Sequence, residues 1–281
     1  MKYSKYHALG NDYIVIRPDD LRDSLPGEMI RTICHRNYGV GSDGILLGPF
    51  ESNSCDFRLK IYNPDGSEAE KSGNGLRIFA RFLCDDEFTA SNSFTIETKG
   101  GRIPCDLSPD RKMVRVEMGQ ISFDSTVIPV NGESREVLNE SIIIDDKKLT
   151  FCAATVGNPH CIIFSEDPSP AEAKLFGPKI ENNPLFPNRA NVQFLKVLDR
   201  FNIRIEIWER GAGYTLASGS SSTAAAAVAY KLGLCDSNIN VHMPGGQIYV
   251  SLTSDFMATM TGPVTKICSG VIENEIFKTS L

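Results

Sequence analysis

The chain has 281 residues and carries 29 lysine and arginine side chains against 35 aspartate and glutamate side chains, which gives a formal net charge of −6. This length allows two domains of ordinary size, each with its own core, and the acidic balance without a basic segment disfavours nucleic acid as a partner. No run of eighteen apolar residues and no apolar signal region near the N-terminus occur, so the sequence predicts a cytoplasmic protein that does not bind membranes.

The cysteines are scattered along the chain, with neither a Cys-x-x-Cys pair nor a Cys/His spacing typical of zinc. We therefore expect free thiols in a reducing compartment, with no metal site. They are Cys34, Cys55, Cys84, Cys105, Cys152, Cys161, Cys235 and Cys268.

The first half of the chain alternates predicted strands with two predicted helices. A hairpin is expected near the N-terminus, because Leu9-Gly-Asn-Asp12 has the composition of a turn. After the second helix, glycine, proline or charged turns separate short strands. The predicted strands are 2–8, 13–16, 44–50, 56–62, 93–98, 101–107 and 113–118, and the predicted helices are 27–35 and 73–84.

A polar, acidic section follows over residues 120–148, and we place the crossover between two domains within it. The predicted N-terminal domain covers residues 1–120 and is completed by a C-terminal strand over 268–281, while the C-terminal domain covers 121–267. The second half has predicted strands at 149–156, 160–164, 191–195, 202–208, 240–242, 247–252, 256–261 and 264–269, and predicted helices at 170–176 and 220–232.

The two halves also match in sequence. Residues 58–73 align without gaps on residues 204–219, at an offset of 146 positions, and both segments lead into a helix with an apolar face. Further upstream, Leu9-Gly-Asn11 matches Val156-Gly-Asn158 at an offset of 147. Two matches at nearly one offset indicate the duplication of one α+β unit.

A serine and a glycine begin the predicted helix in each half. In the second half an apolar strand ends at Trp208, a glycine-rich turn follows, and Ser218-Gly219 leads into an alanine-rich helix. Free N–H groups at a helix start favour an anion, and glycine lets a ligand approach closely. The sequence therefore predicts two halves of a carboxylate-binding site, one here and one at Ser72-Gly73.

Six segments resemble, in order, the signature segments of the diaminopimelate epimerase family, and together they span essentially the whole chain. The resemblance implies an α+β fold with two pseudo-twofold-related domains. Each domain would be a β-sheet or barrel wrapped around a central helix, with the active site in the interdomain cleft. The segments are His7-Ala-Leu-Gly-Asn-Asp-Tyr13, Tyr62-Asn-Pro-Asp-Gly-Ser67, Ser72-Gly-Asn-Gly-Leu-Arg77, Gly157-Asn-Pro-His160, Asn191-Val-Gln-Phe194 and Trp208-Glu-Arg-Gly-Ala-Gly213.

The resemblance further implies an isomerase that epimerises or racemises a small amino-acid substrate at its α-carbon. In this family the reaction converts LL- to meso-diaminopimelate, on the route to lysine and peptidoglycan precursors, without pyridoxal phosphate, metal or any other cofactor. The sequence leaves the oligomeric state open, with a homodimer as one candidate.

Carried over by position, the resemblance places Ser72 and Ser218 where the two proton-transfer groups act. His160 and Glu209 would flank the reacting carbon, and Glu209 would also receive the substrate ammonium. The planar fork of Arg210 suits a distal carboxylate. The implied binding residues are the backbone of Gly73, Asn74, Gly219 and Ser220 for the α-carboxylate, and Asn11, Asn63, Asn158, Asn191 and Arg210 for the other polar groups.

The chain departs from the family at the two proton-transfer positions. The family has cysteines there, whose ordinary pKa of about 8.5 a helix N-terminus can lower. A serine hydroxyl is far less acidic, so activity would be weak or altered unless a partner base assists, with His160 and Glu209 as the local candidates. In addition, Tyr214 stands where the family usually has glutamate, and Ser220-Ser-Ser-Thr223 replaces a Thr-Gly-Ala-Cys run. These further differences favour natural divergence over replacement of two cysteines by mutagenesis.

The residues thus leave three functions open: an epimerase, an enzyme on the same fold that abstracts a proton from one face and then eliminates, isomerises or cyclises, and a silent amino-acid-binding homologue. Simpler interpretations of the same residues also stand. Both serines are good N-cap residues. His160 follows a turn and is compatible with a surface loop, and Glu209 with Arg210 is compatible with a surface ion pair.

Overall fold

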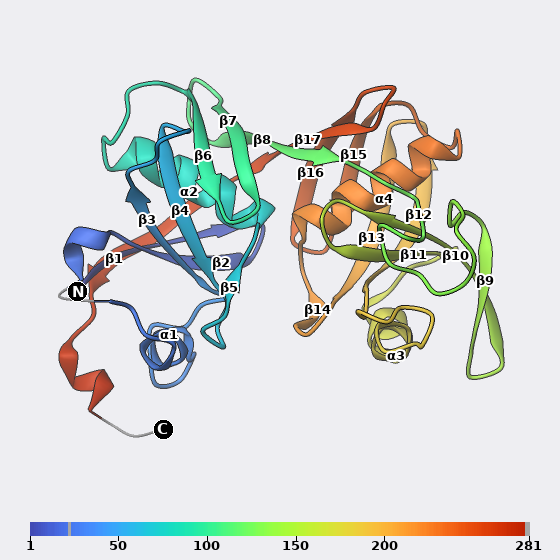
Figure 1. The fold of residues 1–281 in the computed structure, drawn as a ribbon, viewed down its shortest axis with the longest axis horizontal. Coiled ribbons are helices and arrows are strands. Elements are labelled where there is room, and N and C mark those ends of the chain that lie inside the picture. Colours follow the sequence, from blue (N-terminus) through green and yellow to red (C-terminus); the bar gives the residue numbers. More distant parts are fainter. Residues whose placement is uncertain (22–23, 279–281) are drawn as a thin grey trace. The chain divides into compact units, whose positions relative to one another are not determined.

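The structure, a computed structural model, describes residues 1–21 and 24–278 and divides into two compact units (Figure 1). Unit 1 comprises Met1–Glu117 with Gly262–Leu281, and unit 2 comprises Met118–Thr261. The chain therefore leaves unit 1 within strand β8 (Met113–Gln120) and returns to it within strand β17 (Met257–Pro263).

Unit 1 is built on a mixed sheet. Strand β1 (Lys2–Ala8) pairs antiparallel with β2 (Asn11–Ile16) on one side and with β18 (Thr265–Val271) on the other. Strand β2 pairs in parallel with β3 (Ile45–Phe50), and helix α1 (Gly27–Cys34) provides the crossover connection that a parallel pair requires. The sheet continues through β4 (Phe57–Tyr62), its short partner β5 (Glu68–Ala69), β6 (Ser93–Thr98), β7 (Gly101–Leu107) and β8.

Unit 2 repeats these pairings element by element. The antiparallel pair β10 (Lys147–Thr155) and β11 (Pro159–Phe164) takes the place of β1 and β2, and helix α3 (Pro170–Glu181) connects β11 to its parallel neighbour β12 (Asn191–Asp199). The duplication predicted from the sequence is thus confirmed in the topology. The sheet begins with β9 (Glu140–Ile144) and continues after β12 through β13 (Asn202–Glu209), β14 (Gly213–Thr215), β15 (Asn238–Met243), β16 (Gly246–Leu252) and β17.

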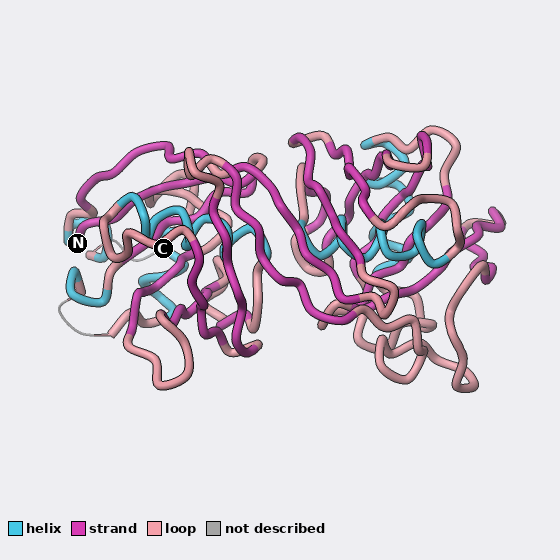
Figure 2. Tube along the Cα trace, turned by 90° about the horizontal axis from the view of Figure 1, so that it is seen from above, coloured by secondary structure: helices cyan, strands magenta, loops and turns pink. Residues whose placement is uncertain are grey.

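One 13-residue helix lies in the core of each unit, α2 (Gly73–Asp85) in unit 1 and α4 (Gly219–Lys231) in unit 2. Figure 2 shows helical segments enclosed by strands within each unit. A helix that is apolar on nearly all sides belongs in an interior. Residues 224–227 of α4 are four fully buried alanines, whose small side chains let strands approach closely. None of the helices in the described residues combines the length and the apolar character needed to cross a bilayer.

The predicted C-terminal strand over residues 268–281 was wrong in its extent. Strand β18 begins at Thr265 and ends at Val271, within two residues of the strand predicted over 264–269, and a 3-10 turn, η2 (Asn274–Phe277), follows. Val271 pairs with Lys2, the first residue of β1, and Ile272 exchanges backbone hydrogen bonds with Met1. Residues 279–281 of that prediction lie outside the described residues.

Two elements of unit 2 also differ from expectation. Strand β9 lies inside the acidic section that we expected to connect the domains, and its buried Ile142 and Ile144 pack in the core of unit 2. Helix α3 continues past its predicted end at residue 176, through Pro178 to Glu181. Proline disfavours a helix interior, but here Glu181, beyond the proline, accepts a hydrogen bond from Trp208 on β13.

Helix α3 approaches β13 closely because it carries a glycine at the contact. A Cβ atom at Gly177 would lie 2.5 Å from Trp208 Cγ and 2.6 Å from Trp208 Cβ. One turn further, Trp208 Nε1 donates a 2.7 Å hydrogen bond to Glu181 Oε2. Helix α3 therefore contacts Trp208 at two points, closely at Gly177 and through the hydrogen bond to Glu181.

We expect Gly177→Ala to lower the free energy of unfolding by about 1–3 kcal/mol, because overpacking at Trp208 outweighs the gain of up to about 1 kcal/mol in helix propensity. Urea unfolding followed by tryptophan fluorescence measures the change, since Trp208 is the single tryptophan. Leu175→Ala on the same helix, at a side chain that is 54% exposed, should change stability by less than about 0.5 kcal/mol. Equal stability of Gly177→Ala and the wild type would contradict this packing argument.

Candidate functional site

In unit 1, Ser72 caps the N-terminus of the core helix α2. Its Oγ accepts a 3.1 Å hydrogen bond from the Gly75 N–H and shares another, also 3.1 Å, with the Tyr13 hydroxyl. The N–H groups of Gly73 and Asn74 lie at the same helix start, where the partial positive charge of a helix favours an anion.

The side chains of Asn11 and Asn74 are locked to each other beside this helix start. Asn74 Nδ2 donates to Asn11 Oδ1 at 3.0 Å, and Asn11 Nδ2 donates to Asp43 Oδ2 at 2.8 Å. Arg77 Nη2 completes the series with a 2.8 Å hydrogen bond to Asn74 Oδ1. Because a carboxylate can only accept and a guanidinium can only donate, the two ends of this series fix the orientation of both amides.

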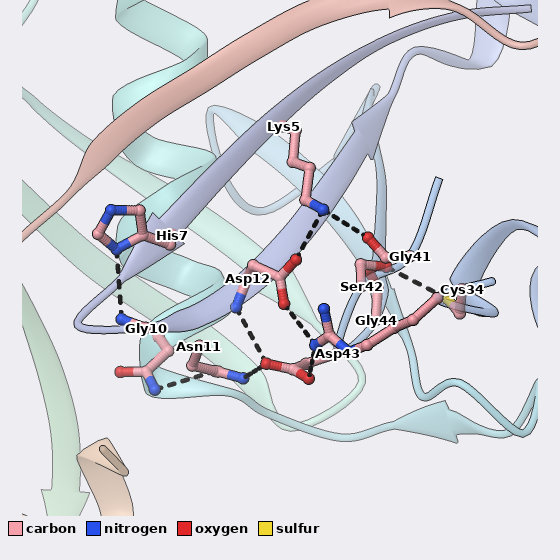
Figure 3. Close-up of polar contacts among 12 residues, drawn as sticks. Lys5, His7, Gly10, Asn11, Asp12, Cys34, Gly41, Ser42, Asp43 and Gly44 are labelled. Atoms are coloured by element: carbon pink, nitrogen blue, oxygen red, sulfur yellow. Dashed lines mark hydrogen bonds and ion pairs between the residues drawn. The ribbon is translucent and has the colours of Figure 1, made fainter. Parts of the chain in front are cut away.

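The carboxylate end of the series belongs to an ionic cluster of residues from β1, β2 and the segment before β3 (Figure 3). Arg36 Nη2 contacts Asp43 Oδ1 at 2.6 Å and Asp12 Oδ1 at 2.8 Å, and Lys5 Nζ contacts Asp12 Oδ2 at 2.9 Å. Burial raises the pKa of Asp12, but hydrogen bonds from Arg36 and Lys5 outweigh burial and hold this pKa below its ordinary value. Asp12 is therefore a fixed negative charge, and Asp43 is held against it by the shared Arg36.

The guanidinium end is wholly buried. Arg77 has no exposed surface, and burial lowers its pKa to about 9, so it remains a cation at neutral pH. Its Nη1 lies 3.4 Å from the Gly73 carbonyl oxygen, which places the charge behind the start of α2. A Cβ atom at Gly262 would lie only 3.1 Å from Arg77 Nε, so the glycine makes room for the guanidinium. Arg77 thus adds to the positive potential that a carboxylate would meet there.

Among the predicted binding residues of unit 1, Asn63 is the one whose side chain bonds to none of the groups at the start of α2. It is exposed, follows β4, and donates from Nδ2 to Ser67 Oγ at 3.0 Å within its own turn. Its backbone N–H bonds to the Ser67 carbonyl in the same turn.

In unit 2, Ser218 caps helix α4 in the same way, with its Oγ accepting from the Ser221 N–H at 3.4 Å. Asn158 Nδ2 donates to Ser220 Oγ at 3.5 Å, which brings the start of β11 to the start of α4. Asn158 and Ser220 occupy the positions that match Asn11 and Asn74 in unit 1. The two units therefore repeat one contact as well as one topology, although the helix residue donates in unit 1 and accepts in unit 2.

His160 lies fully buried on β11, which excludes the interpretation as a surface loop histidine. Burial lowers its pKa to about 3, the Gln193 side chain opposes that effect, and Arg210 adds to it. The ring is therefore neutral at working pH. Its Nε2 lies 3.0 Å from Asn158 Oδ1, and because an amide oxygen only accepts, Nε2 is the protonated nitrogen.

Asn191 ties the strand ends of unit 2 together. It pairs with His160 across the parallel β11–β12 ladder, and its Nδ2 donates to the Pro159 carbonyl at 2.9 Å. Its Oδ1 accepts from the Arg210 N–H at 3.0 Å. The turn that carries the half-buried Glu209 and Arg210 is thereby fixed to β12, and Arg210 Nη1 donates to the Asn188 carbonyl at 2.9 Å.

Sequence reasoning missed several polar residues that hold these groups. Gln193, fully buried, donates from Nε2 to Ser221 Oγ at 2.9 Å, and a glutamine inside an apolar strand was a visible signal. Arg77 gave a similar signal on the apolar face of α2, whereas nothing in the sequence singled out Asp43 or Tyr13. In the described ranges, no group of three His, Cys, Asp or Glu side chains is arranged to hold a metal ion.

Comparison with known proteins identifies the family. The family model for diaminopimelate epimerase matches residues 3–123 and 152–267. A Nostoc sp. protein named diaminopimelate epimerase 2 is 60% identical over 277 residues, covering 99% of this chain and 97% of the relative. The diaminopimelate epimerase of Alkaliphilus metalliredigens is 36% identical over 282 residues, covering 99% of both chains.

A solved structure agrees at the level of the fold. The crystal structure of a hydroxyproline epimerase from Agrobacterium vitis, with bound trans-4-hydroxy-L-proline, superposes with a TM-score of 0.72 at 14% identity, covering 96% of this chain and 90% of that chain. The match to the family model and the whole-length identity to named epimerases show that the chain belongs to the diaminopimelate epimerase family.

Proposed function

We propose that this protein is a cofactor-independent amino-acid epimerase that inverts one α-carbon of LL-diaminopimelate to give the meso form. Membership of the family supports the substrate class. The single observation that carries the proposal is the repeated arrangement of a serine hydroxyl at the start of a core helix, with an anchored amide side chain beside it, in both units.

In the proposed reaction, the two helix starts bind the α-carboxylate of the substrate. Negative charge moves onto that carboxylate as the α-proton leaves, so donors and dipoles already aimed at it stabilise the transition state more than the ground state. One serine takes the proton from one face while the other serine supplies a proton to the opposite face. The proposal therefore requires that Ser72 and Ser218 reach the same α-carbon.

The other residues then serve binding and orientation. Arg210 binds the distal carboxylate with its planar guanidinium, and Glu209 receives the α-ammonium. Asn11, Asn158 and Asn191 hold polar groups of the substrate, and Asn63 does so from its exposed turn. His160 is buried and already hydrogen-bonded to Asn158. We therefore propose that it orients the Asn158 side chain and does not itself transfer a proton to or from the substrate.

Incubation with LL-diaminopimelate in deuterated water should give meso-diaminopimelate with one deuterium at the inverted carbon, as measured by mass spectrometry and chiral chromatography. Ser72→Ala and Ser218→Ala should each lower this rate by at least about 100-fold, since each removes one proton-transfer group. Ser251→Ala, which removes a hydroxyl that bonds Asn238 outside both half-sites, should leave the rate unchanged.

Two outcomes would overturn the proposal. The absence of α-deuterium in both product and recovered substrate would remove the epimerase activity. A product that is neither the epimer nor the mirror image of the substrate would instead indicate proton removal from one face followed by elimination, isomerisation or cyclisation.

The buried neutral His160 also predicts how stability depends on pH. An unfolded histidine titrates near pH 6.5, while the folded pKa is about 3, so the unfolded chain binds the additional proton between these values. The contribution of His160 is therefore complete above about pH 6.5 and is lost as the pH falls towards 3.

Between pH 6.5 and 4.5, the wild type should lose about 2 kcal/mol more unfolding free energy than His160→Gln, which cannot titrate but can still donate to Asn158. Urea titrations at the two pH values measure the difference, and the other titrating groups cancel in the comparison. Parallel pH dependence of the two proteins would show that His160 is not held neutral by burial.

A further inference from the structure

The two serines do not have the same neighbours. Tyr13 on β2 and His160 on β11 occupy matching positions of the duplicated units, two residues after Asn11 and Asn158. The His160 ring bonds to Asn158, whereas the Tyr13 hydroxyl reaches the helix start and lies 3.1 Å from Ser72 Oγ. In the part of the chain that the structure describes, Ser218 Oγ accepts a hydrogen bond from the Ser221 N–H and makes none with a tyrosine hydroxyl.

A second difference between the units, glycine at position 44 where unit 2 has Asn191, makes room for the Tyr13 ring. Gly44 precedes β3 as Asn191 begins β12, so these two positions also match between the units. A Cβ atom at Gly44 would lie 2.6 Å from Tyr13 Cε1 and 2.6 Å from the Tyr62 carbonyl oxygen. A side chain like that of Asn191 would not fit there. Tyr13, only 7% exposed, is thus built into this position together with Gly44.

The Tyr13 hydroxyl determines which hydrogen-bonding sites of the Ser72 hydroxyl are occupied. A serine hydroxyl has one proton and two acceptor sites, and the Gly75 N–H occupies one acceptor site of Ser72. When Tyr13 donates, both acceptor sites are used, and the Ser72 proton is available to another group. When Tyr13 accepts the Ser72 proton, one acceptor site of Ser72 Oγ stays open. The direction of this one bond therefore decides whether Ser72 can give or take a proton.

We propose that Tyr13 is the positioning residue through which Ser72 exchanges its hydroxyl proton, an inference that rests on the proposed epimerase function. In proton removal, the ionised Tyr13 oxygen accepts the Ser72 hydroxyl proton as Ser72 Oγ takes the α-proton, which leaves a neutral phenol, a neutral serine and the substrate carbanion. In proton return, each transfer runs backwards. A phenol is far more acidic than an aliphatic alcohol, so this route replaces the scarce serine alkoxide.

Tyr13→Phe, measured in two backgrounds, tests the proposal. With Ser72 present, the variant should lower kcat for α-deuterium exchange by about 100-fold and leave KM within about 2-fold, because the phenol acts on the proton and not on the substrate. In the Ser72→Cys background, the same change should cost less than about 3-fold, because a thiol ionises near working pH without a phenol. Wild-type kcat should rise with pH towards the ionisation of a phenol, and Tyr13→Phe should lose that rise.

Tyr6→Phe is the matched control. Tyr6 pairs with Tyr13 in the β1–β2 ladder, and its hydroxyl donates to Asp85, away from Ser72. Its loss should leave kcat and KM within about 2-fold in both backgrounds, with folding of all variants verified by thermal unfolding.

The outcomes separate this inference from the proposed function. An equal loss for Tyr13→Phe in both backgrounds would show a merely structural role, and no loss with Ser72 present would overturn the inference while the epimerase stands. Exchange by Ser72→Cys but not by the wild type would show that Tyr13 does not make Ser72 competent. Absence of exchange in the wild type, Ser72→Cys and Ser72→Cys/Ser218→Cys alike would remove the proposed function itself.

Discussion

The structure depends on a helix that begins inside a protein core. A buried helix start must find partners for N–H groups that no turn of the helix can satisfy, and a serine cap supplies one of them, at Gly75 in unit 1 and at Ser221 in unit 2. The adjacent donors remain at the positive end of the helix. The same serine that caps each helix therefore lies where an anion is favoured, so stability and the proposed chemistry share one hydroxyl.

The two units have the same backbone arrangement around the starts of α2 and α4 but place different side chains there. Unit 1 surrounds its helix start with charge, from the buried Arg77 to the carboxylates of Asp43 and Asp12. Unit 2 uses neutral groups, the His160 ring and the amides of Asn158 and Asn191. The charged groups of unit 1 leave its amides no choice of donor and acceptor, and in unit 2 the Pro159 carbonyl and the Arg210 N–H fix the amide of Asn191 in the same way. Duplication thus provides two similar backbones, while the side chains give the two serines different hydrogen-bond neighbours.

Much of this arrangement could be predicted from the sequence. Serine followed by glycine marked both core helices to within one residue, because capping is a local interaction. The strand predicted over 264–269 lies within two residues of β18, but the C-terminal strand expected over 268–281 was wrong, since the pairing partner β1 lies more than 260 residues away in the sequence. The Tyr13–Ser72 bond was equally inaccessible, because it joins residues 59 positions apart and requires the space that Gly44 leaves.

A crystal structure with meso-diaminopimelate bound would test the central claim most directly. The account predicts that the N–H groups at the starts of α2 and α4 both bind the α-carboxylate. It also predicts that Ser72 Oγ and Ser218 Oγ lie within about 3.5 Å of one α-carbon on opposite faces. A ligand whose α-carbon is reached by only one of the serines, or whose carboxylate lies away from both helix starts, would contradict the account.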